Sequence, residues 1–299
     1  MSEENYKREI NKVIEIKELP KYSDWIEFLI GLKKTSKKKK NLSTIEKEFG
    51  KDKWLKIRKA IKNIKGKKLE KAIESEMGRK KKNAYWKEDN LYLADSSEIN
   101  KNYFEIIRIT LEEYIEESNC LIELGAGYGS IILRLAKSDK FKNKEFIAGE
   151  YTEEGQNCLK IIAKEIDCRI QIGYCDLTKL DLKSFNVPPD SIIITNWALA
   201  YQKGISRKTI EEIIKIKPKL IINFEPIYEN WNEKNLLHYF WRRYAEINDY
   251  NKKILEALLT YQKEGIVKII NNRKNVIGDQ PLAPISIITW KPCRDIKDV

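Results

Sequence analysis

The sequence predicts an α/β protein with a mostly parallel sheet. From Cys120 onward, short apolar runs alternate with helical patterns, as expected when helices connect parallel strands and cover both faces. The last two apolar runs have no helical pattern between them, which predicts a terminal antiparallel hairpin. Three glycines, Gly125, Gly127 and Gly129, mark the first turn from strand to helix. Seven strands are expected, at 120–124, 145–149, 168–173, 191–195, 219–224, 265–271 and 284–290.

Residues 1–82 are expected to form a separate, small, basic helical domain. Tyr22 to Asp24 can cap a first apolar helix, and the run from Lys33 to Lys40 predicts a solvated loop. Ser43 to Glu46 has the form of a capping box before a second helix. The aromatic and aliphatic residues of this second helix recur at helical spacing. This spacing favours the core of a small domain over a surface that stacks on nucleic-acid bases.

Residues 83–299 are expected to form the main domain, with a helical insertion at about 226–264. Residues 83–95 break the helical period and predict a connecting loop. Helices are expected at 100–117, 129–137, 153–165, 207–215 and, within the insertion, 247–261.

The net charge of +12 comes from the first part of the chain. Residues 1–90 hold 27 Lys and Arg against 15 Asp and Glu, whereas residues 91–299 hold 30 against 30. A basic segment beside a neutral one suggests an anionic partner. The alternative is a coding bias, because 46 of the 57 basic residues are lysine and the chain is also rich in isoleucine and asparagine.

Several classes of protein are disfavoured by composition. No apolar run reaches 18 residues and the N-terminus lacks an apolar signal core, so a cytoplasmic protein without a membrane span is expected. The five cysteines include no Cys-x-x-Cys pair, which favours buried reduced thiols. With His238 as the single histidine, no structural metal site is expected.

The stretch Glu123-Leu124-Gly125-Ala126-Gly127-Tyr128-Gly129 resembles the first motif of class I S-adenosylmethionine-dependent methyltransferases. The predicted strand order is also similar to that family's, and the resemblance covers about 85–292 but not the first 80 residues. A dinucleotide-binding dehydrogenase would need glycine at the sixth place, where Ser130 stands. The resemblance implies a Rossmann-like sheet and S-adenosylmethionine as the cofactor.

The resemblance also implies where that cofactor binds. Glu150, at the end of the second strand, can accept two hydrogen bonds from ribose hydroxyls. Asp176 is implied to accept from the adenine amino group, although an aspartate there can also be a strand-end cap. The implied cofactor residues are Glu123, Gly125, Ala126, Gly127, Glu150, Tyr151, Cys175, Asp176, Leu177, Asn196 and Trp197.

The methyl acceptor is less defined by sequence. The candidate bases are Glu225 at a strand end, His238 with its near-neutral pKa, and Tyr201. For His238 the alternative is a packing role, and for Arg242 and Arg243 it is an exposed helix face. The expected acceptor-binding residues are Trp197, Tyr228, Arg242 and Tyr244.

Three functions remain open from the sequence. The first is methylation of an oxygen or nitrogen on a small molecule, peptide or protein, with the N-terminal helices and the insertion forming the acceptor pocket. The second is an RNA methyltransferase whose basic N-terminal part binds phosphates. The third is a protein that binds the cofactor without catalysis. Thr195-Asn196-Trp197-Ala198 follows the fourth strand in place of Asn-Pro-Pro-Tyr, a departure from the enzymes that methylate amino groups of nucleic-acid bases and of glutamine.

Overall fold

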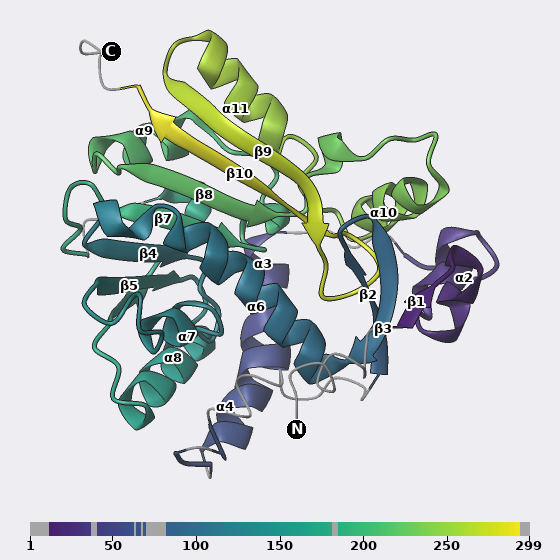
Figure 1. Cartoon of the computed structure of the whole chain (residues 1–299), viewed down its shortest axis with the longest axis horizontal. Coiled ribbons are helices and arrows are strands. Elements are labelled where there is room, and N and C mark those ends of the chain that lie inside the picture. The colour runs from purple at the N-terminus through teal and green to yellow at the C-terminus, as the bar shows by residue number, and fades with distance from the viewer. Residues whose placement is uncertain are drawn as a thin grey trace, which may run out of the picture.

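The computed structural model of the chain describes residues 12–36, 41–62, 64–66, 68–69, 82–180 and 185–293. These residues form one sheet of ten strands with helices on both faces (Figure 1). The strand order is β1-β3-β2-β9-β10-β8-β7-β4-β5-β6.

The centre of the sheet is parallel, as predicted. Its strands pair in parallel in the order β8-β7-β4-β5-β6, because each is reached through a crossover that returns the chain to the same edge. Leu124 lies beside both Gly149 and Thr195, so three strands end nearly level. Their bounds are Cys120–Leu124 (β4), Glu145–Glu150 (β5), Gln171–Tyr174 (β6), Ile192–Asn196 (β7) and Leu220–Glu225 (β8).

The terminal hairpin is also confirmed. β9 (Val267–Ile277) and β10 (Ile285–Pro292) pair antiparallel, and β10 pairs antiparallel with β8. β10 therefore lies between β8 and β9, so the last strand of the chain is an inner strand of the sheet.

The prediction of seven strands is wrong, because three more strands extend the sheet beyond β9. These are β1 (Lys12–Ile14), β2 (Lys82–Lys87) and β3 (Asn90–Asp95), all antiparallel. The loop expected at 83–95 is therefore a hairpin. Its turn places Glu88 and Asp89 at positive φ, 44° and 67°, a conformation usually signalled by Asn-Gly. The missing glycine explains why the sequence pattern did not reveal the turn.

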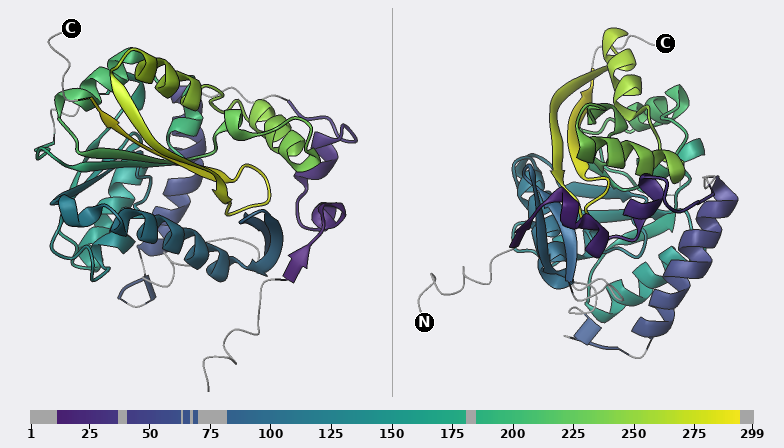
Figure 2. Two further views of the ribbon diagram at one scale, coloured as in Figure 1. Left: turned by 45° about the horizontal axis from the view of Figure 1, so that its top comes forward. Right: turned by 90° about the vertical axis from the view of Figure 1, so that its right-hand side faces the viewer.

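Helices cover the two faces of the parallel strands (Figure 2). One face packs against α6 (Ser96–Glu112), α7 (Ile132–Ala136) and α8 (Glu153–Glu165). The other face packs against α9 (Arg207–Lys215) and α11 (Ile254–Lys263). α8 and α9 have the predicted bounds, and each begins at a hydroxyl cap, Thr152 or Ser206, that accepts a backbone hydrogen bond.

The insertion, in which at least one helix was predicted at 247–261, holds two, and the second of them begins at Ile254. α10 (Leu236–Ile247) and α11 are separated because Asn248 ends the first and Asp249 follows at φ 56°. α10 packs with α2 (Trp25–Leu29) and the three extra strands around a separate apolar core that contains Trp86, Trp231 and Trp241. Short 3₁₀ turns occur at Ile16–Lys21 (η1), Ile115–Glu117 (η3), Leu177–Lys179 (η4), Leu199–Tyr201 (η5) and Tyr228–Asn230 (η6).

The N-terminal helical segment is continuous and lies along α8. It consists of α3 (Leu42–Ile45), the π-helical η2 (Glu46–Trp54) and α4 (Leu55–Ile61), and the right-hand view of Figure 2 shows it along its length. The predicted capping box is misplaced by two residues, since Asn41 and Thr44 exchange the capping bonds, both of 2.9 Å. Arg58 pairs with Glu154 of α8 at 2.6 Å. Residues 1–11, 37–40 and 70–81 lie outside the described part, and a separate domain over 1–82 stays a prediction.

Within the described part of the chain, no helix combines the length and the apolar character that crossing a bilayer requires.

Candidate functional site

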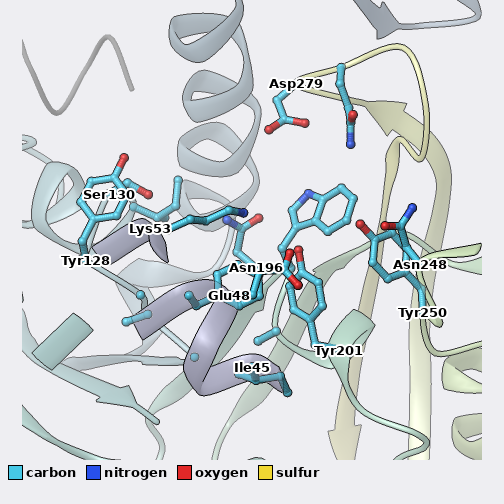
Figure 3. Close-up of a pocket in the computed structure, with 18 of the residues that line it drawn as sticks. Ile45, Glu48, Lys53, Tyr128, Ser130, Asn196, Tyr201, Asn248, Tyr250 and Asp279 are labelled. Atoms are coloured by element: carbon cyan, nitrogen blue, oxygen red, sulfur yellow. The ribbon is translucent and has the colours of Figure 1, made fainter. Parts of the chain in front are cut away.

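A cavity of about 710 Å³ lies at the carboxyl ends of the parallel strands. Ligands of open α/β sheets bind at this edge, where the loops after the strands converge. The floor comes from the loops after β4, β5, β6 and β7, and the walls come from the N-terminal segment, α6, the end of α10 and the β9–β10 loop. Figure 3 shows side chains from the N-terminal segment, from the loops after β4 and β7 and from the β9–β10 loop around one space.

The glycine turn after β4 forms part of the cavity floor. Gly125 and Gly127 have φ of 78° and 58°, values that side chains disfavour. The N–H groups of Gly125 and Ala126 both donate to the carbonyl of Gly149, at 2.8 and 3.0 Å. A Cβ at Gly125 would lie 2.5 Å from the Cβ of Ala198. Glycine is therefore required here for both conformation and space.

Glu150 ends β5 as a buried carboxylate beside this turn. Its Oε2 accepts from the N–H of Gly127 at 2.9 Å, and its Oε1 accepts from the N–H and hydroxyl of Thr152 at 2.9 and 2.6 Å. Burial raises the pKa of Glu150, while the hydrogen bonds from Thr152 and Gly127 oppose that rise. The carboxylate is thus held rigidly at the cavity wall.

Asp176 follows β6 on the next strand of the sheet. Its Oδ1 accepts from the N–H and hydroxyl of Thr178, at 2.8 and 2.6 Å, and so caps η4. The cap expected as an alternative role is therefore present, and the residue also lines the cavity between Cys175 and Leu177. Both capping bonds end on one oxygen of the carboxylate.

Glu123, at the end of β4, has a carboxyl group that is buried beneath the cavity floor. It is 2% exposed, and its Oε2 accepts from the N–H of Ile132 at 3.1 Å. Desolvation by burial raises its pKa to about 8. This carboxyl group is consequently protonated near neutral pH.

Asn196 and Trp197 form the end of β7 at the centre of the cavity. The hydroxyl of Tyr103, on α6, donates to the side-chain oxygen of Asn196 at 2.7 Å. Trp197 has φ 54°, and its indole Nε1 is buried without a hydrogen-bond partner among the described residues. A strained residue with an unsatisfied donor is more common at functional sites than elsewhere.

The structure brings together all the residues expected around the cofactor. Every one of them lines the cavity: Glu123, Gly125, Ala126, Gly127, Glu150, Tyr151, Cys175, Asp176, Leu177, Asn196 and Trp197. Of the residues expected around the acceptor, Tyr201, Trp197 and Tyr244 also line it.

Glu225 has a different place from the one expected of a base. Its fully buried carboxylate accepts from the N–H groups of Ala198, Leu199 and Ala200 at 2.9 to 3.1 Å. Desolvation raises its pKa to about 7, and these hydrogen bonds oppose the rise. Glu225 does not line the cavity; it anchors η5, the turn that carries Tyr201.

The remaining three acceptor candidates lie together outside the cavity, on and beside α10. His238 stacks on Trp241 at 4.6 Å, its Nδ1 accepts from the N–H of Asn232, and burial lowers its pKa. Arg242 pairs with Glu233 at 2.6 Å and lies 4.0 Å from the ring centroid of Tyr228. None of His238, Arg242 and Tyr228 lines the cavity.

Several lining residues were not expected from the sequence. They share an origin in the N-terminal segment or in turns around the insertion and the hairpin, and include Trp25, Glu48, Phe49, Lys53, Trp54, Tyr250 and Asp279. Phe49 and Trp54 were assigned to the core of an N-terminal domain. Trp54 instead packs on the glycine turn, where its ring would lie 3.0 Å from a Cβ at Gly127. Among the described residues, no group of His, Cys, Asp and Glu could hold a metal ion.

Comparisons with known proteins give distant structural neighbours only. No family model matches the chain, and no curated protein matches it in sequence. Similar solved structures include the mitomycin 7-O-methyltransferase MmcR (TM-score 0.44, 11% identity, 66% of this chain and 56% of that one). Others are an O-methyltransferase family protein from Burkholderia thailandensis (0.45, 11%, 67% and 60%) and an S-adenosylmethionine-dependent methyltransferase from Clostridium acetobutylicum (0.43, 11%, 64% and 89%).

The alignment spans less than two thirds of the first two of these neighbours.

Proposed function

We propose that the protein is an S-adenosylmethionine-dependent methyltransferase. The observation that carries the proposal is the meeting, in one cavity, of the glycine turn after β4, Glu150 after β5 and Asp176 after β6. β4, β5 and β6 are successive strands of the sheet, so a ligand that crosses their ends would meet the glycine turn, Glu150 and Asp176 in that order.

The residues present fit such a cofactor. Glu150 would accept hydrogen bonds from the ribose hydroxyls, and the oxygen of Asp176 that does not cap η4 would accept from the adenine amino group. Gly125 and Gly127 present bare backbone to the ligand. The cavity, at about 710 Å³, falls in the usual size range of small-molecule sites and has room for a second ligand beside the cofactor.

When bound, the cofactor supplies a methyl group that is already electrophilic. The chain's own residues therefore have to align an acceptor nucleophile, exclude water and receive a proton where the acceptor releases one. Burial, together with the neighbouring Tyr244, Glu48 and Asp279, raises the pKa of Tyr201 well above 10. Tyr201 is consequently a hydrogen-bond donor to the acceptor rather than a base.

The acceptor that this cavity favours is a nitrogen or oxygen of a small molecule or of a side chain on a peptide. The N-terminal segment and α10 enclose the space beside Trp197, which suits a compact group better than a duplex. Methylation of RNA and binding of the cofactor without catalysis remain the alternative predictions.

Two measurements test the proposal. In calorimetry, S-adenosylmethionine and S-adenosylhomocysteine should bind with micromolar or better affinity, whereas NAD and ATP should not compete. In extracts from a strain that lacks the gene, label from methyl-labelled S-adenosylmethionine should enter metabolites or peptides. Label found in RNA alone would favour an RNA methyltransferase. Binding of the cofactor without methyl transfer would favour a non-catalytic protein. If neither compound bound, the proposal would be contradicted.

A further inference from the structure

One end of the cavity is a box of aromatic rings. The rings contact one another in series, with centroid distances of 4.8 Å for Trp25–Tyr244 and Phe49–Tyr201, and 5.5 to 6.3 Å for the rest. Figure 3 places Tyr201 and Tyr250 at the end of the cavity away from Tyr128 and Ser130. The box consists of Trp25, Phe49, Trp197, Tyr201, Tyr244 and Tyr250, all of which line the cavity.

The charges that face the cavity are mainly negative, although the chain carries a net charge of +12. Among the described lining residues, six are acidic, and Lys53 is the single basic one. Glu150 and Asp176 belong to the floor, as does Glu123, whose carboxyl group is protonated near neutral pH and adds no charge. The other three, Asp24, Glu48 and Asp279, line the cavity as the rings of the box do. Figure 3 shows Glu48 and Asp279 on different sides of the cavity.

One ring of the box already contacts a cation of the chain itself. The ammonium group of Lys53 lies 4.4 Å from the ring centroid of Phe49, and its side chain extends into the cavity (Figure 3). Aromatic faces attract cations through their quadrupole, and carboxylates beside them add a Coulombic attraction. An uncharged alcohol or phenol would gain neither interaction.

We propose that the methyl acceptor is an amine, held in the aromatic box as a cation between Glu48 and Asp279. This inference rests on the proposed methyl transfer and narrows its acceptor to a substrate that is positively charged at neutral pH. A bound ammonium group gives its proton to Glu48 or Asp279, and the freed nitrogen lone pair then takes the methyl group. The carbon–sulfur bond breaks in that step, its electron pair stays on sulfur, and the carboxylic acid returns the proton to solvent.

The test compares two probes of the same shape and different charge. Choline carries a quaternary ammonium group that cannot be methylated, and 3,3-dimethylbutan-1-ol is its uncharged analogue. Titrations followed by tryptophan fluorescence, with and without saturating S-adenosylhomocysteine, should give a dissociation constant about tenfold or more lower for choline. The double variant Glu48→Gln/Asp279→Asn should lose most of this preference, because it keeps the shape of the box and removes both charges.

The control is Asp139→Asn, which removes a fully exposed carboxylate in the loop after α7 and should leave the preference unchanged. Equal affinities for the two probes, or a preference that survives in the double variant, would overturn the inference. The binding of S-adenosylhomocysteine is measured in the same samples. If S-adenosylhomocysteine binds and the probes show no preference, the amine assignment fails and the proposed methyl transfer stands. If choline is preferred and S-adenosylhomocysteine does not bind, the box binds a cation and the proposed methyl transfer fails.

Discussion

Glu150 links the glycine turn to the start of α8. Its carboxylate accepts from Gly127 on one side and from Thr152, the cap of α8, on the other. The orientation of this side chain is therefore fixed before any ligand binds, which lowers the conformational cost of binding.

The variant Glu150→Ala is expected to bind S-adenosylmethionine more weakly by about 2 to 3 kcal/mol, because two hydrogen bonds to a charged acceptor are lost. Isothermal calorimetry measures the change. Glu145→Ala, at the exposed start of the same strand, is the control and should bind normally. An unchanged affinity in Glu150→Ala would show that the ribose is held elsewhere.

Gly125 allows the effects of backbone conformation and of space to be separated. Gly125→Ala and Gly265→Ala each put a side chain at a positive φ, 78° and 74°, but at Gly265 nothing lies within 4 Å of the new Cβ. Both variants should lose about 1 kcal/mol of stability in urea unfolding from backbone strain. Only Gly125→Ala, which meets Ala198, should lose several kcal/mol and cofactor binding. Similar losses in the two variants would contradict the packing described here.

Among single residues, the sequence predicted the floor of the cavity better than its walls. Glycines, Glu150 and Asp176 follow strand ends directly, so their position in the chain nearly determines their position in space. Glu225 also follows a strand, but its carboxylate turns toward the N–H groups of η5, which no local pattern reveals. His238 and Arg242 lie on a helix whose direction depends on packing with α2 and the extra strands.

Among the elements, β4 carries a protonated carboxyl group into the core of the site. The pKa of Glu123 is about 8 in the folded protein, against 4.5 for an unperturbed glutamate side chain. Between these two values the folded protein keeps a proton that the unfolded chain releases. The contribution of Glu123 to stability is therefore complete below about pH 4.5 and is lost as the pH rises through 8.

The variant Glu123→Gln should remove this dependence. We expect the free energy of unfolding of the wild type to fall by roughly 2 to 4 kcal/mol more than that of the variant between pH 5 and pH 8. Urea unfolding at a series of pH values measures both. Glu145→Gln is the control at an exposed position, and parallel curves for the wild type and Glu123→Gln would refute the assignment.

The strands that the sequence did not predict were missed for a common physical reason. β2 and β3 turn through Glu88 and Asp89 without a glycine, and β1 is a three-residue edge strand that depends on β3 for its hydrogen bonds. Both features arise from tertiary pairing. α8 and α9, by contrast, begin at hydroxyl caps and present one apolar stripe, so local sequence determined their bounds.

For the whole molecule, the N-terminal segment is a wall of the cavity rather than an appendage. Phe49 contacts Tyr201, Trp54 contacts Tyr128, and the sulfur of Cys158 on α8 donates to the carbonyl of Trp54 at 3.3 Å. The N-terminal segment covers the glycine turn and so encloses the site as a cavity.

Hydrogen exchange tests this role. Saturating S-adenosylhomocysteine should slow the exchange of backbone amides in residues 41–62 several-fold, because a ligand that contacts Trp54 stabilises this segment against local unfolding. α11, which packs on the opposite face of the sheet and does not line the cavity, is the internal control and should change little. Equal protection of both regions would indicate global stabilisation instead.

The π-helical η2 reaches both ends of the cavity, with Trp54 over the glycine turn and Phe49 against Tyr201 in the aromatic box. A ligand that contacts η2 at one end of the cavity should restrict the motion of this one helix at the other end as well. The affinities for cofactor and acceptor should therefore be linked, and linkage is reciprocal. Each ligand should raise the affinity for the other by the same factor, so that the methyl donor is enclosed most tightly when a nucleophile is there to receive it.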